Sequence, residues 1–391
     1  MGAWHMALDL DSTEGHLELP FRFDVTGGPE ALNLVIHNQD EAITVDSVSF
    51  RGDSIRIRMP FFDSEFLGAL KGDSAFQGVW INHYKGPDYR IPFLATAGAQ
   101  PRFPGATTAP SIDLSGDWEV HFTHAEDPDQ DEPAIGIFTQ DKGQVKGSFA
   151  TPSGDLRFLE GVITGDSLFL STFNGSMAYL FRAAIHGDSL SGDFHSGHRW
   201  AQPWYAVRNP HFTLPDDESM TKLNPDHPVA FSFPGVDGHV HSSSDEQYKG
   251  KVVVLDIMGT WCPNCLDEAR MLQEFQQKYQ AQGLEVVSLC FERGTDDAKA
   301  LEAIRRFGER LGITYSLLYA GQATKENVAQ ALPFIDRLKA YPTTLIIGRD
   351  GRVGHIYTGI YGPGTGARYI RFKERMENAI VQLLNTPAER Q

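Results

Sequence analysis

The chain has 391 residues and a net charge of −17, from 34 basic and 51 acidic side chains. This length predicts two or three domains, and the acidic balance argues against binding to nucleic acid or to an anionic membrane surface. Most of the acidity lies in residues 1–215, which carry 14 basic and 28 acidic side chains; it serves either solubility or an acidic docking face. No run of 18 apolar residues occurs, so no membrane span is expected.

Residues 1–210 contain an internal repeat. Each copy opens with a Gly-x-Trp sequence, at Trp4 and at Trp118, and each carries two Gly-Asp-Ser turns. The spacing from the Trp to the first of these Asp residues is 49 positions in one copy and 48 in the other. Two copies of roughly 100 residues are too long for a solenoid repeat, so a duplicated domain is expected, with boundaries at 1–110 and 111–210.

Each copy alternates short apolar runs, such as SIRIRMPFF and SLFLSTF, with the Gly-Asp turns. Turns of this kind between alternating runs are typical of β-hairpins. The expected fold class here is antiparallel β, as two small barrels or sandwiches or as one continuous sandwich. Trp4 and Trp118 are expected in the core, since tryptophan is mostly buried.

A stretch rich in Pro and Asp, residues 208–228, predicts the linker to a third domain, residues 211–391. The sequence VAFSFPGVDGHVHS then predicts a hairpin. His239 and His241 within it are expected to be exposed strand residues rather than metal ligands.

The most informative stretch is Lys251–Tyr279. An apolar run at 252–257 is short enough to be a strand buried on both faces, and apolar residues recur at helical spacing after the turn that holds Cys262 and Cys265. The cysteines therefore lie at or just before a helix N-terminus, where free backbone N–H groups stabilise a thiolate. This placement predicts a redox pair in which Cys262 attacks and Cys265 resolves the mixed disulfide.

Two other chemistries are less favoured for this pair. A structural zinc needs four Cys or His ligands, and the one further cysteine, Cys290, lies in an apolar run that predicts an inert core thiol. A peroxidase would need a Pro-x-x-x-Thr/Ser-x-x-Cys setting, but Leu255 and Gly259 occupy the positions concerned.

The remaining sequence predicts alternating strands and helices. The expected elements are a strand at Leu284–Phe291, a helix at Asp296–Arg310, a strand at Thr314–Tyr319, a helical insertion at Ala323–Lys339, a hairpin of Thr343–Ile347 with Arg352–Tyr357, and a closing helix at Ala367–Leu384. A Gly-rich loop at 359–366 has no GxGxxG and no following P-loop lysine, so nucleotide binding is not expected.

The motif GTWCPNC after an apolar strand resembles the thioredoxin superfamily, in particular the TlpA/ResA-like extracytoplasmic thiol-disulfide oxidoreductases. Asp256, six positions before the first cysteine, matches the buried Asp of thioredoxins, and Glu268 matches a Glu frequent in TlpA-like proteins. Tyr341-Pro342 before TLIIGRDGRV resembles the cis-proline loop of the fold. One departure is Arg270, where many members have Pro. The resemblance runs from about Phe212 to the C-terminus and implies an α/β thioredoxin-like fold.

The resemblance also implies roles for residues around the cysteines. Trp261, Pro263, Tyr341 and Pro342 are the candidates for substrate binding, with a cis Tyr341–Pro342 bond facing the cysteine pair, and Glu268 is a supporting residue. No cofactor and no metal are expected.

Asp256 also stands out without the resemblance. It lies in an apolar strand, where an unpaired carboxylate is costly to bury. Burial would raise its pKa and make it the candidate base for Cys265, the alternative being a solvated Asp on an edge strand.

The favoured function is a thiol-disulfide oxidoreductase that reduces or exchanges disulfides of partner proteins and is recharged by an upstream protein electron donor. The alternative is a surface-binding protein whose β module recognises a protein or glycan. The family implies an extracytoplasmic location. MGAWHMALDLD shows no signal-peptide pattern, so we expect that a leader, with or without a lipid anchor, has been removed.

Overall fold

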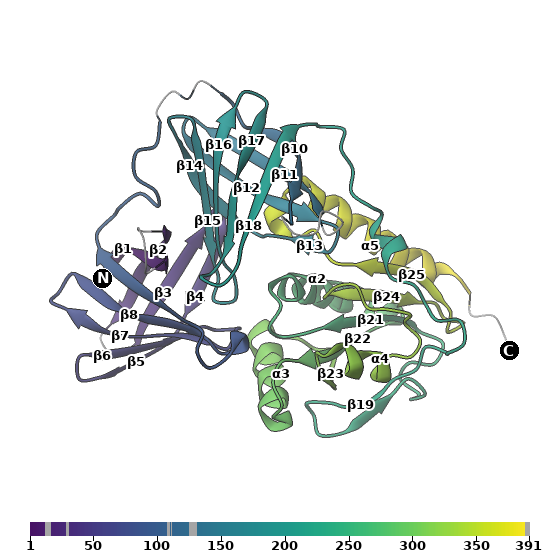
Figure 1. Ribbon diagram of the computed structural model, residues 1–391. Coiled ribbons are helices and arrows are strands. Elements are labelled where there is room, and N and C mark those ends of the chain that lie inside the picture. The colour runs from purple at the N-terminus through teal and green to yellow at the C-terminus, as the bar shows by residue number, and fades with distance from the viewer. Residues whose placement is uncertain (12–16, 29–30, 108–109, 111, 125–130, 388–391) are drawn as a thin grey trace. The chain divides into compact units, whose positions relative to one another are not determined.

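The computed structural model describes residues 1–11, 17–28, 31–107, 110, 112–124 and 131–387. They form two compact units. The first holds residues 1–151 and 156–214, and the second holds 152–155 together with the chain from Pro215 onward. The first unit is built from antiparallel strands and the second combines strands with helices, which confirms the predicted change of fold class along the chain (Figure 1).

The first unit begins with a nine-stranded antiparallel sheet in the order β4-β3-β2-β1-β9-β8-β7-β6-β5. Most neighbours in this order are also neighbours in sequence, because short turns join antiparallel strands. Its strands are β1 (Gly2–Asp11), β2 (Leu17–Gly28), β3 (Ala31–Asn38), β4 (Glu41–Val45), β5 (Ser47–Arg51), β6 (Ser54–Arg58), β7 (Ser64–Lys71), β8 (Ala75–Asn82) and β9 (Arg90–Ala97), with the 3-10 helix η1 (His83–Lys85) before β9.

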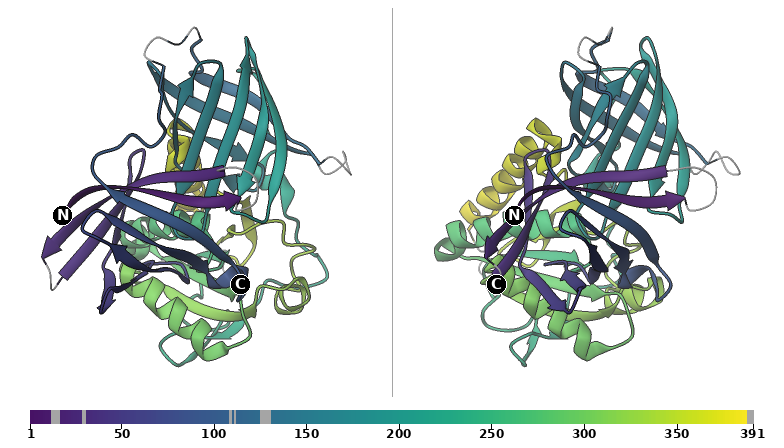
Figure 2. Two further views of the ribbon diagram at one scale, coloured as in Figure 1. Left: turned by 60° about the vertical axis from the view of Figure 1, so that its left-hand side comes forward. Right: turned by 90° about the vertical axis from the view of Figure 1, so that its left-hand side faces the viewer.

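A second sheet follows in the order β11-β10-β18-β17-β16-β15-β14-β12-β13, and β11 also pairs with β12. That pairing closes eight of the strands into a ring, visible in both views of Figure 2. Its strands are β10 (Gly116–Phe122), β11 (Glu132–Asp141), β12 (Gln144–Thr151), β13 (Gly154–Asp155), β14 (Leu159–Thr164), β15 (Ser167–Phe173), β16 (Ala178–His186), β17 (Ser189–Ser196) and β18 (Ala201–Arg208).

The repeated motifs occupy matching places in the two sheets. Trp4 lies on β1 and Trp118 on β10, and each of these strands pairs with the next strand and with the last strand of its sheet. The four Gly-Asp-Ser turns join β5 to β6, β7 to β8, β14 to β15 and β16 to β17. Their glycines have φ of 60° to 62°, a left-handed conformation that favours glycine. This matching order supports the predicted duplication.

The two tryptophans differ in burial. Trp118 is fully buried inside the closed sheet, as expected. Trp4 is only partly buried and packs against the edge of its core, so the expectation of a core position was too strong for it. The difference follows from closure, because a ring of strands encloses every inward side chain whereas an open sheet leaves its margins accessible.

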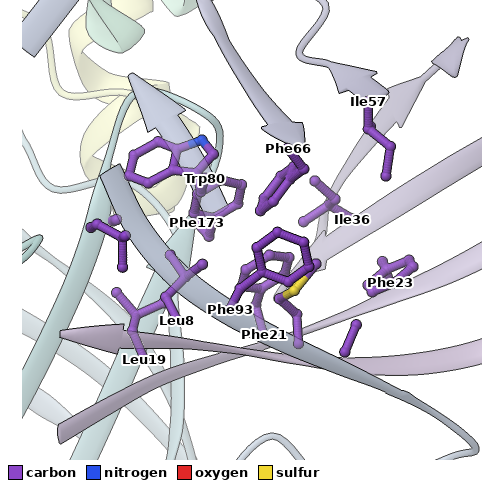
Figure 3. Packing of buried hydrophobic residues seen from close by; sticks show 14 of the residues in the cluster. Leu8, Leu19, Phe21, Phe23, Ile36, Ile57, Phe66, Trp80, Phe93 and Phe173 are labelled. Carbon is purple, nitrogen blue, oxygen red and sulfur yellow. The ribbon is translucent and has the colours of Figure 1, made fainter. Parts of the chain in front are cut away.

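The core of the first sheet is completed by the second. Phe173 from β15 stacks on Phe21 from β2 with ring centroids 4.4 Å apart, and its ring also meets Phe66 and Trp80 (Figure 3). All four side chains are almost fully buried. The outer face of the closed sheet is therefore apolar where the first sheet covers it, and side chains of both sheets form one hydrophobic cluster there, distinct from the core inside the closed sheet.

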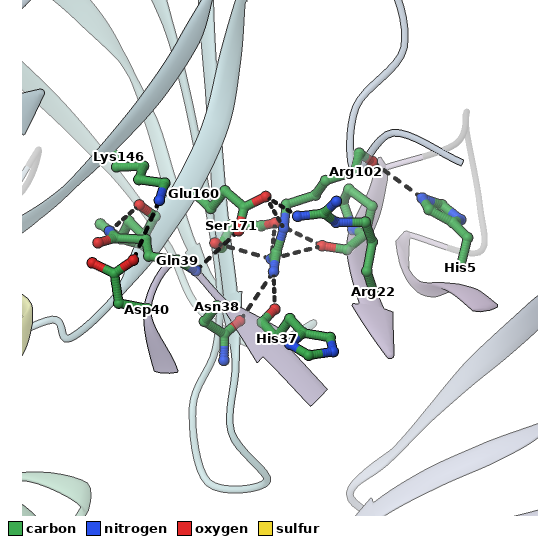
Figure 4. A network of polar contacts seen from close by, with 12 residues as sticks. His5, Arg22, His37, Asn38, Gln39, Asp40, Arg102, Lys146, Glu160 and Ser171 are labelled. Atoms are coloured by element: carbon green, nitrogen blue, oxygen red, sulfur yellow. Dashed lines mark hydrogen bonds and ion pairs between the residues drawn. The ribbon is translucent and has the colours of Figure 1, made fainter. Parts of the chain in front are cut away.

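A polar network also joins the two sheets. The guanidinium of Arg102 is buried and donates to the carbonyl oxygens of Pro20 and His37, to the carbonyl and hydroxyl oxygens of Ser171, and to Asn38 Oδ1 (Figure 4). It also lies 3.8 Å from Glu160. Burial lowers the pKa of Arg102 to about 10. The charge stays buried because nearly every donor has a partner.

The second unit contains a five-stranded sheet in the order β23-β22-β21-β24-β25. The first three of these strands run parallel, and β24 and β25 are antiparallel to their neighbours. Its strands are β21 (Val252–Met258), β22 (Leu284–Glu292), β23 (Ser316–Gln322), β24 (Thr343–Ile347) and β25 (Val353–Thr358), with a separate hairpin of β19 (Ser232–Pro234) and β20 (Val240–Ser242).

Helices pack on this sheet. Those that contact its strands include α2, α3, α4 and α5. The helices of the unit are α1 (Asp217–Met220), α2 (Pro263–Tyr279), α3 (Asp297–Leu311), α4 (Lys325–Ala331) and α5 (Ala367–Asn385), with the 3-10 helices η3 (Gln280–Gln282) and η4 (Pro363–Thr365). Within the described ranges, no helix is both long and apolar enough to cross a membrane.

Two expectations from sequence were wrong in extent. The helical insertion predicted at Ala323–Lys339 is helical only over α4, because Pro333 cannot continue a helix, and Ile335 instead bridges to Leu223. The segment predicted as a linker is structured in its second half, where Asp217 of α1 is buried against Arg375.

Candidate active site

The helix α2 starts directly after Cys262, which is its N-cap residue. Cys262 has extended backbone angles, and Pro263 occupies the first helical position, where its missing N–H costs nothing and its fixed φ suits the helix. The sulfur of Cys262 takes the place of a capping oxygen and accepts a hydrogen bond from the backbone N–H of Cys265 at 3.4 Å. Cys262 thus lies at the start of the helix and Cys265 in its first turn, as the spacing predicted.

The two sulfurs differ in exposure. Cys262 retains 7% of its surface, whereas Cys265 is fully buried one helical turn further on. The Cys262 thiol also lies 3.5 Å from the carbonyl oxygen of Tyr341, whose peptide bond to Pro342 is cis, as predicted. Cys262 is therefore the more exposed cysteine of a largely buried pair.

The electrostatic surroundings separate the two thiols further. Hydrogen bonds from the Cys265 side chain and from backbone N–H groups lower the pKa of Cys262, and the charge of Arg293 adds to this effect. Burial raises the pKa of Cys265 well above that of a free thiol, and the neighbouring Cys262 and Asp256 raise it further. Cys262 is consequently the more acidic thiol of the pair.

Asp256 lies buried in β21, with 1% of its surface exposed, so the alternative of a solvated edge-strand residue does not hold. Its register partners on either side are Ser288 and Thr344, and the Ser288 hydroxyl donates to Asp256 Oδ2 at 2.6 Å. The other carboxylate oxygen has no hydrogen-bond partner within the described part of the chain. Burial raises the pKa of Asp256 to about 7.

Glu268 extends from α2 toward the same interior. It is 1% exposed, and neither carboxylate oxygen has a hydrogen-bond partner within the described residues. Burial and the charge of Asp256 raise the pKa of Glu268 well above its usual value. Two buried carboxyl groups that interact in this way hold at least one proton between them near neutral pH.

The residues expected to bind substrate fall into two groups. The rings of Trp261 and Tyr341 are partly exposed beside Cys262 and meet edge to face, with centroids 5.3 Å apart. Pro263 and Pro342 are buried and shape the backbone around the sulfur rather than offer surface. A contact between these prolines and a substrate stays a prediction.

Asn264, between the cysteines, is buried and donates from Nδ2 to the carbonyl oxygen of Asp155, one of the four residues at 152–155 that belong to this unit. This contact could not be predicted from sequence, because 109 positions separate the two residues. Arg270, which replaces a common proline, is half-exposed and lies 3.6 Å from Asp267. With an N–H at this position, α2 runs without a break from Pro263 to Tyr279.

Other residues considered from sequence lie apart from this chemistry. Cys290 is fully buried in β22, and burial raises its pKa well above that of a free thiol. His239 is exposed as expected, but His241 is largely covered and pairs with Asp237 at 2.9 Å. Among the described residues, no group of three or more His, Cys, Asp or Glu side chains is placed to hold a metal ion.

Sequence reasoning missed two residues at the end of β22. Glu292 is buried and accepts hydrogen bonds from Thr260, and the guanidinium of Arg293 lies 3.8 Å from the centroid of the Trp261 ring. A signal was present: charged residues directly follow an apolar strand parallel to the one that leads into the cysteine turn, and such strand ends meet at one edge of a sheet.

A sheet of this order with a Cys-x-x-Cys pair at the start of α2 defines a thioredoxin-fold redox domain. Residues 225–356 match the family described as AhpC/TSA. The thiol-disulfide oxidoreductase ResA of Geobacillus kaustophilus is 29% identical over 155 residues, which cover 40% of this chain and 78% of that protein. ResA of Geobacillus thermodenitrificans is 30% identical over 129 residues, covering 33% of this chain and 66% of that protein.

Solved structures to which the chain is similar include a putative thiol:disulfide interchange protein DsbE from Chlorobium tepidum, with 23% identity and a TM-score of 0.32 over 42% of this chain and 97% of that one. A secreted thiol-disulfide isomerase from Corynebacterium glutamicum has 19% identity and a TM-score of 0.34 over 45% of this chain and 97% of that one. Through its C-terminal unit the chain is a TlpA/ResA-like member of the thioredoxin superfamily, and it is a thiol-disulfide oxidoreductase.

Proposed function

We propose that the protein reduces or exchanges disulfides of partner proteins through Cys262 and Cys265. The observation that carries the proposal is the contrast between the two cysteines at the start of α2: Cys262 retains 7% of its surface and has a lowered pKa, whereas Cys265 is fully buried and has a raised pKa. Thiolate is the nucleophile in disulfide exchange, so this contrast sets the order of attack.

In the first step, the Cys262 thiolate attacks one sulfur of the partner disulfide. A Cys262–partner disulfide forms, the partner S–S bond breaks, and the second partner sulfur leaves as a thiolate. In the second step, the Cys265 thiolate attacks the sulfur of Cys262 and expels the other partner sulfur. The partner disulfide is reduced to two thiols while the cysteine pair is oxidised to a disulfide, and an upstream protein donor restores the dithiol.

The second step needs the proton of Cys265 to be removed. Asp256 has a pKa of about 7 because it is buried, so near neutral pH its carboxylate can accept that proton. Glu268, whose pKa is raised well above its usual value, keeps a proton on the pair near neutral pH and so leaves Asp256 as the carboxyl that exchanges a proton in this range. Asp256 is the proposed base, acting directly or through one water.

Trapping tests this assignment. A Cys265→Ala variant can form the mixed disulfide but cannot resolve it, so it should accumulate covalent adducts with oxidised protein substrates that a reductant releases. A Cys262→Ser variant is the matched control and should accumulate none. Equal adducts in both variants, or insulin reduction that survives Cys262→Ser, would contradict the order of attack.

The family resemblance supports a reaction outside the cytoplasm, and we propose oxidised extracytoplasmic proteins as the substrates. Within this proposal the N-terminal unit contributes partner choice or stability and no redox chemistry, because all three cysteines lie beyond residue 261. The alternative of a binding protein with an accessory redox fold gains no support from the relatives, which are named as oxidoreductases.

A further inference from the structure

The end of β22 holds the turn that precedes the attacking cysteine. The backbone N–H and the hydroxyl of Thr260 donate to the two carboxylate oxygens of Glu292, at 2.8 Å and 2.7 Å. The indole N–H of Trp261 donates to the carbonyl oxygen of Phe291 at 2.9 Å. The guanidinium of Arg293 covers the indole ring at 3.8 Å from its centroid. Three consecutive residues of one strand end thus contact two consecutive residues of the turn.

The contact between this strand end and the turn is close. A Cβ atom placed on Gly259 would lie 2.3 Å from the indole nitrogen of Trp261 and 2.7 Å from the carbonyl oxygen of Phe291, so no larger residue fits there. Glu292 is 2% exposed, and a buried carboxylate is stable only if it receives hydrogen bonds. Both of its oxygens receive them from Thr260, two residues before the first cysteine.

We propose that Glu292 and Arg293 are positioning residues of the thiol exchange at Cys262. Glu292 fixes the peptide at Thr260 and with it the direction in which the chain enters α2. Arg293 holds the Trp261 ring against Tyr341 and brings a positive charge to the accessible sulfur. The inference rests on the proposed function, since it concerns the same attack by Cys262.

Glu292 and Arg293 contribute in different ways, so experiments can distinguish their positioning roles from a purely structural role. Hydrogen bonds to Cys262 from Cys265 are the main cause of its lowered pKa, and the charge of Arg293 adds to them. Removing that charge should therefore change the pH profile of the thiol without loss of fold, because Arg293 is exposed. Removing the Thr260 hydroxyl should instead change how fast a correctly ionised thiol reacts.

The experiment compares matched variants of the full chain. Arg293→Gln removes the charge and Arg293→Lys keeps it; Arg306→Gln, on the exposed face of α3, is the control for net charge. Iodoacetamide labelling of Cys262 across pH should show its apparent pKa raised by about 0.5 unit in Arg293→Gln, the size of one partly screened charge interaction, and unchanged in the other two variants.

A second pair tests the hydrogen bonds. Thr260→Val keeps the shape and removes the hydroxyl, and Thr260→Ser keeps the hydroxyl. The rate at which the reduced protein attacks 5,5′-dithiobis(2-nitrobenzoic acid) is measured well above the pKa of Cys262. It should fall by roughly threefold to tenfold in Thr260→Val, less than the roughly hundredfold that a misplacement of about 1 Å can cost, and should stay at the wild-type value in Thr260→Ser.

The inference is overturned if the apparent pKa of Cys262 is the same in Arg293→Gln as in Arg306→Gln, or if folded Thr260→Val reacts as fast as the wild type. If Thr260→Val does not fold, the Arg293 pair decides. A wild-type protein that forms no reversible Cys262–Cys265 disulfide would refute the proposed function instead, so the two failures are distinguishable.

Discussion

The two units bury ionisable groups in opposite ways. In the N-terminal unit, the Arg102 guanidinium is surrounded by oxygen acceptors from both sheets and by the Glu160 carboxylate. In the C-terminal unit, Asp256 receives one hydroxyl bond and the oxygens of Glu268 receive none from the described residues. A buried charge with fixed partners is costly to remove, whereas buried acids short of partners hold protons that can move.

The largest expected effect on stability comes from removing the buried charge of Arg102. Arg102→Met should lower the free energy of unfolding of the N-terminal unit by about 3–5 kcal/mol, because the oxygens around it lose their donor inside the core. Denaturant unfolding followed by tryptophan fluorescence measures this, as five of the six tryptophans lie before residue 205. Arg22→Met, whose side chain is 43% exposed, is the control and should cost much less.

Replacing Asp256, the buried acid that lacks partners, is expected to have the opposite effect on the free energy of unfolding. The pKa of Asp256 is about 7 in the folded chain, above its unfolded value, so the folded state binds the extra proton and stability falls as pH rises from about 4 to about 7. Asp256→Asn removes this loss. The variant should be more stable than the wild type at pH 8 by up to about 4 kcal/mol, with little difference below pH 4.

Asp256→Asn should nevertheless slow the second chemical step. In single-turnover experiments with a model disulfide, formation of the Cys262 adduct should stay near the wild-type rate, while release by Cys265 should slow by about a hundredfold or more, the usual cost of losing a general base. A release rate that matches the wild type at every pH would leave Asp256 as a structural residue and break the comparison with Arg102.

A smaller effect is expected from removing the N-terminal unit. A fragment that starts at Phe212 should keep general disulfide-reductase activity, because the cysteines and the buried acids all lie within it. It lacks Asp155 and therefore the hydrogen bond to Asn264, so a modest change in reduction potential is expected. Redox equilibration with glutathione measures it. A folded but inactive fragment would mean that residues before 212 help to build the site.

The smallest effect is expected at the third thiol. Cys290→Ala should leave insulin reduction within about twofold of the wild type, because the thiol is fully buried and protonated. It should cost about 1 kcal/mol of stability through the small cavity. Strong loss of activity in a folded Cys290→Ala variant would show that Cys290 takes part in exchange.

Local sequence patterns were enough to predict much of the redox unit. The β-branched run before the cysteines, Pro263 at the helix start and the spacing of the apolar residues after it are short-range signals, and β21 and α2 form where they indicated. The buried position of Asp256 could also be inferred, since every neighbour along its strand is apolar.

Other features depend on contacts that sequence does not display. Arg102 meets partners 64 to 82 positions away, and Glu292 meets Thr260 across 32 positions. Closure of the second sheet likewise depends on the long-range pairing of its first strand, β10, with its last strand, β18. Periodicity alone also extended the helix at Ala323–Lys339 past Pro333, where backbone chemistry ends it.

The most direct test of the whole account is the order in which the three thiols react. The reduced protein would be alkylated at graded pH and the labelled cysteines identified by mass spectrometry. The predicted result is that Cys262 labels first, with an apparent pKa below the free-thiol value of about 8.5, while Cys265 and Cys290 stay unlabelled until much higher pH or until unfolding. Labelling of Cys265 or Cys290 ahead of Cys262 in the folded protein would contradict it.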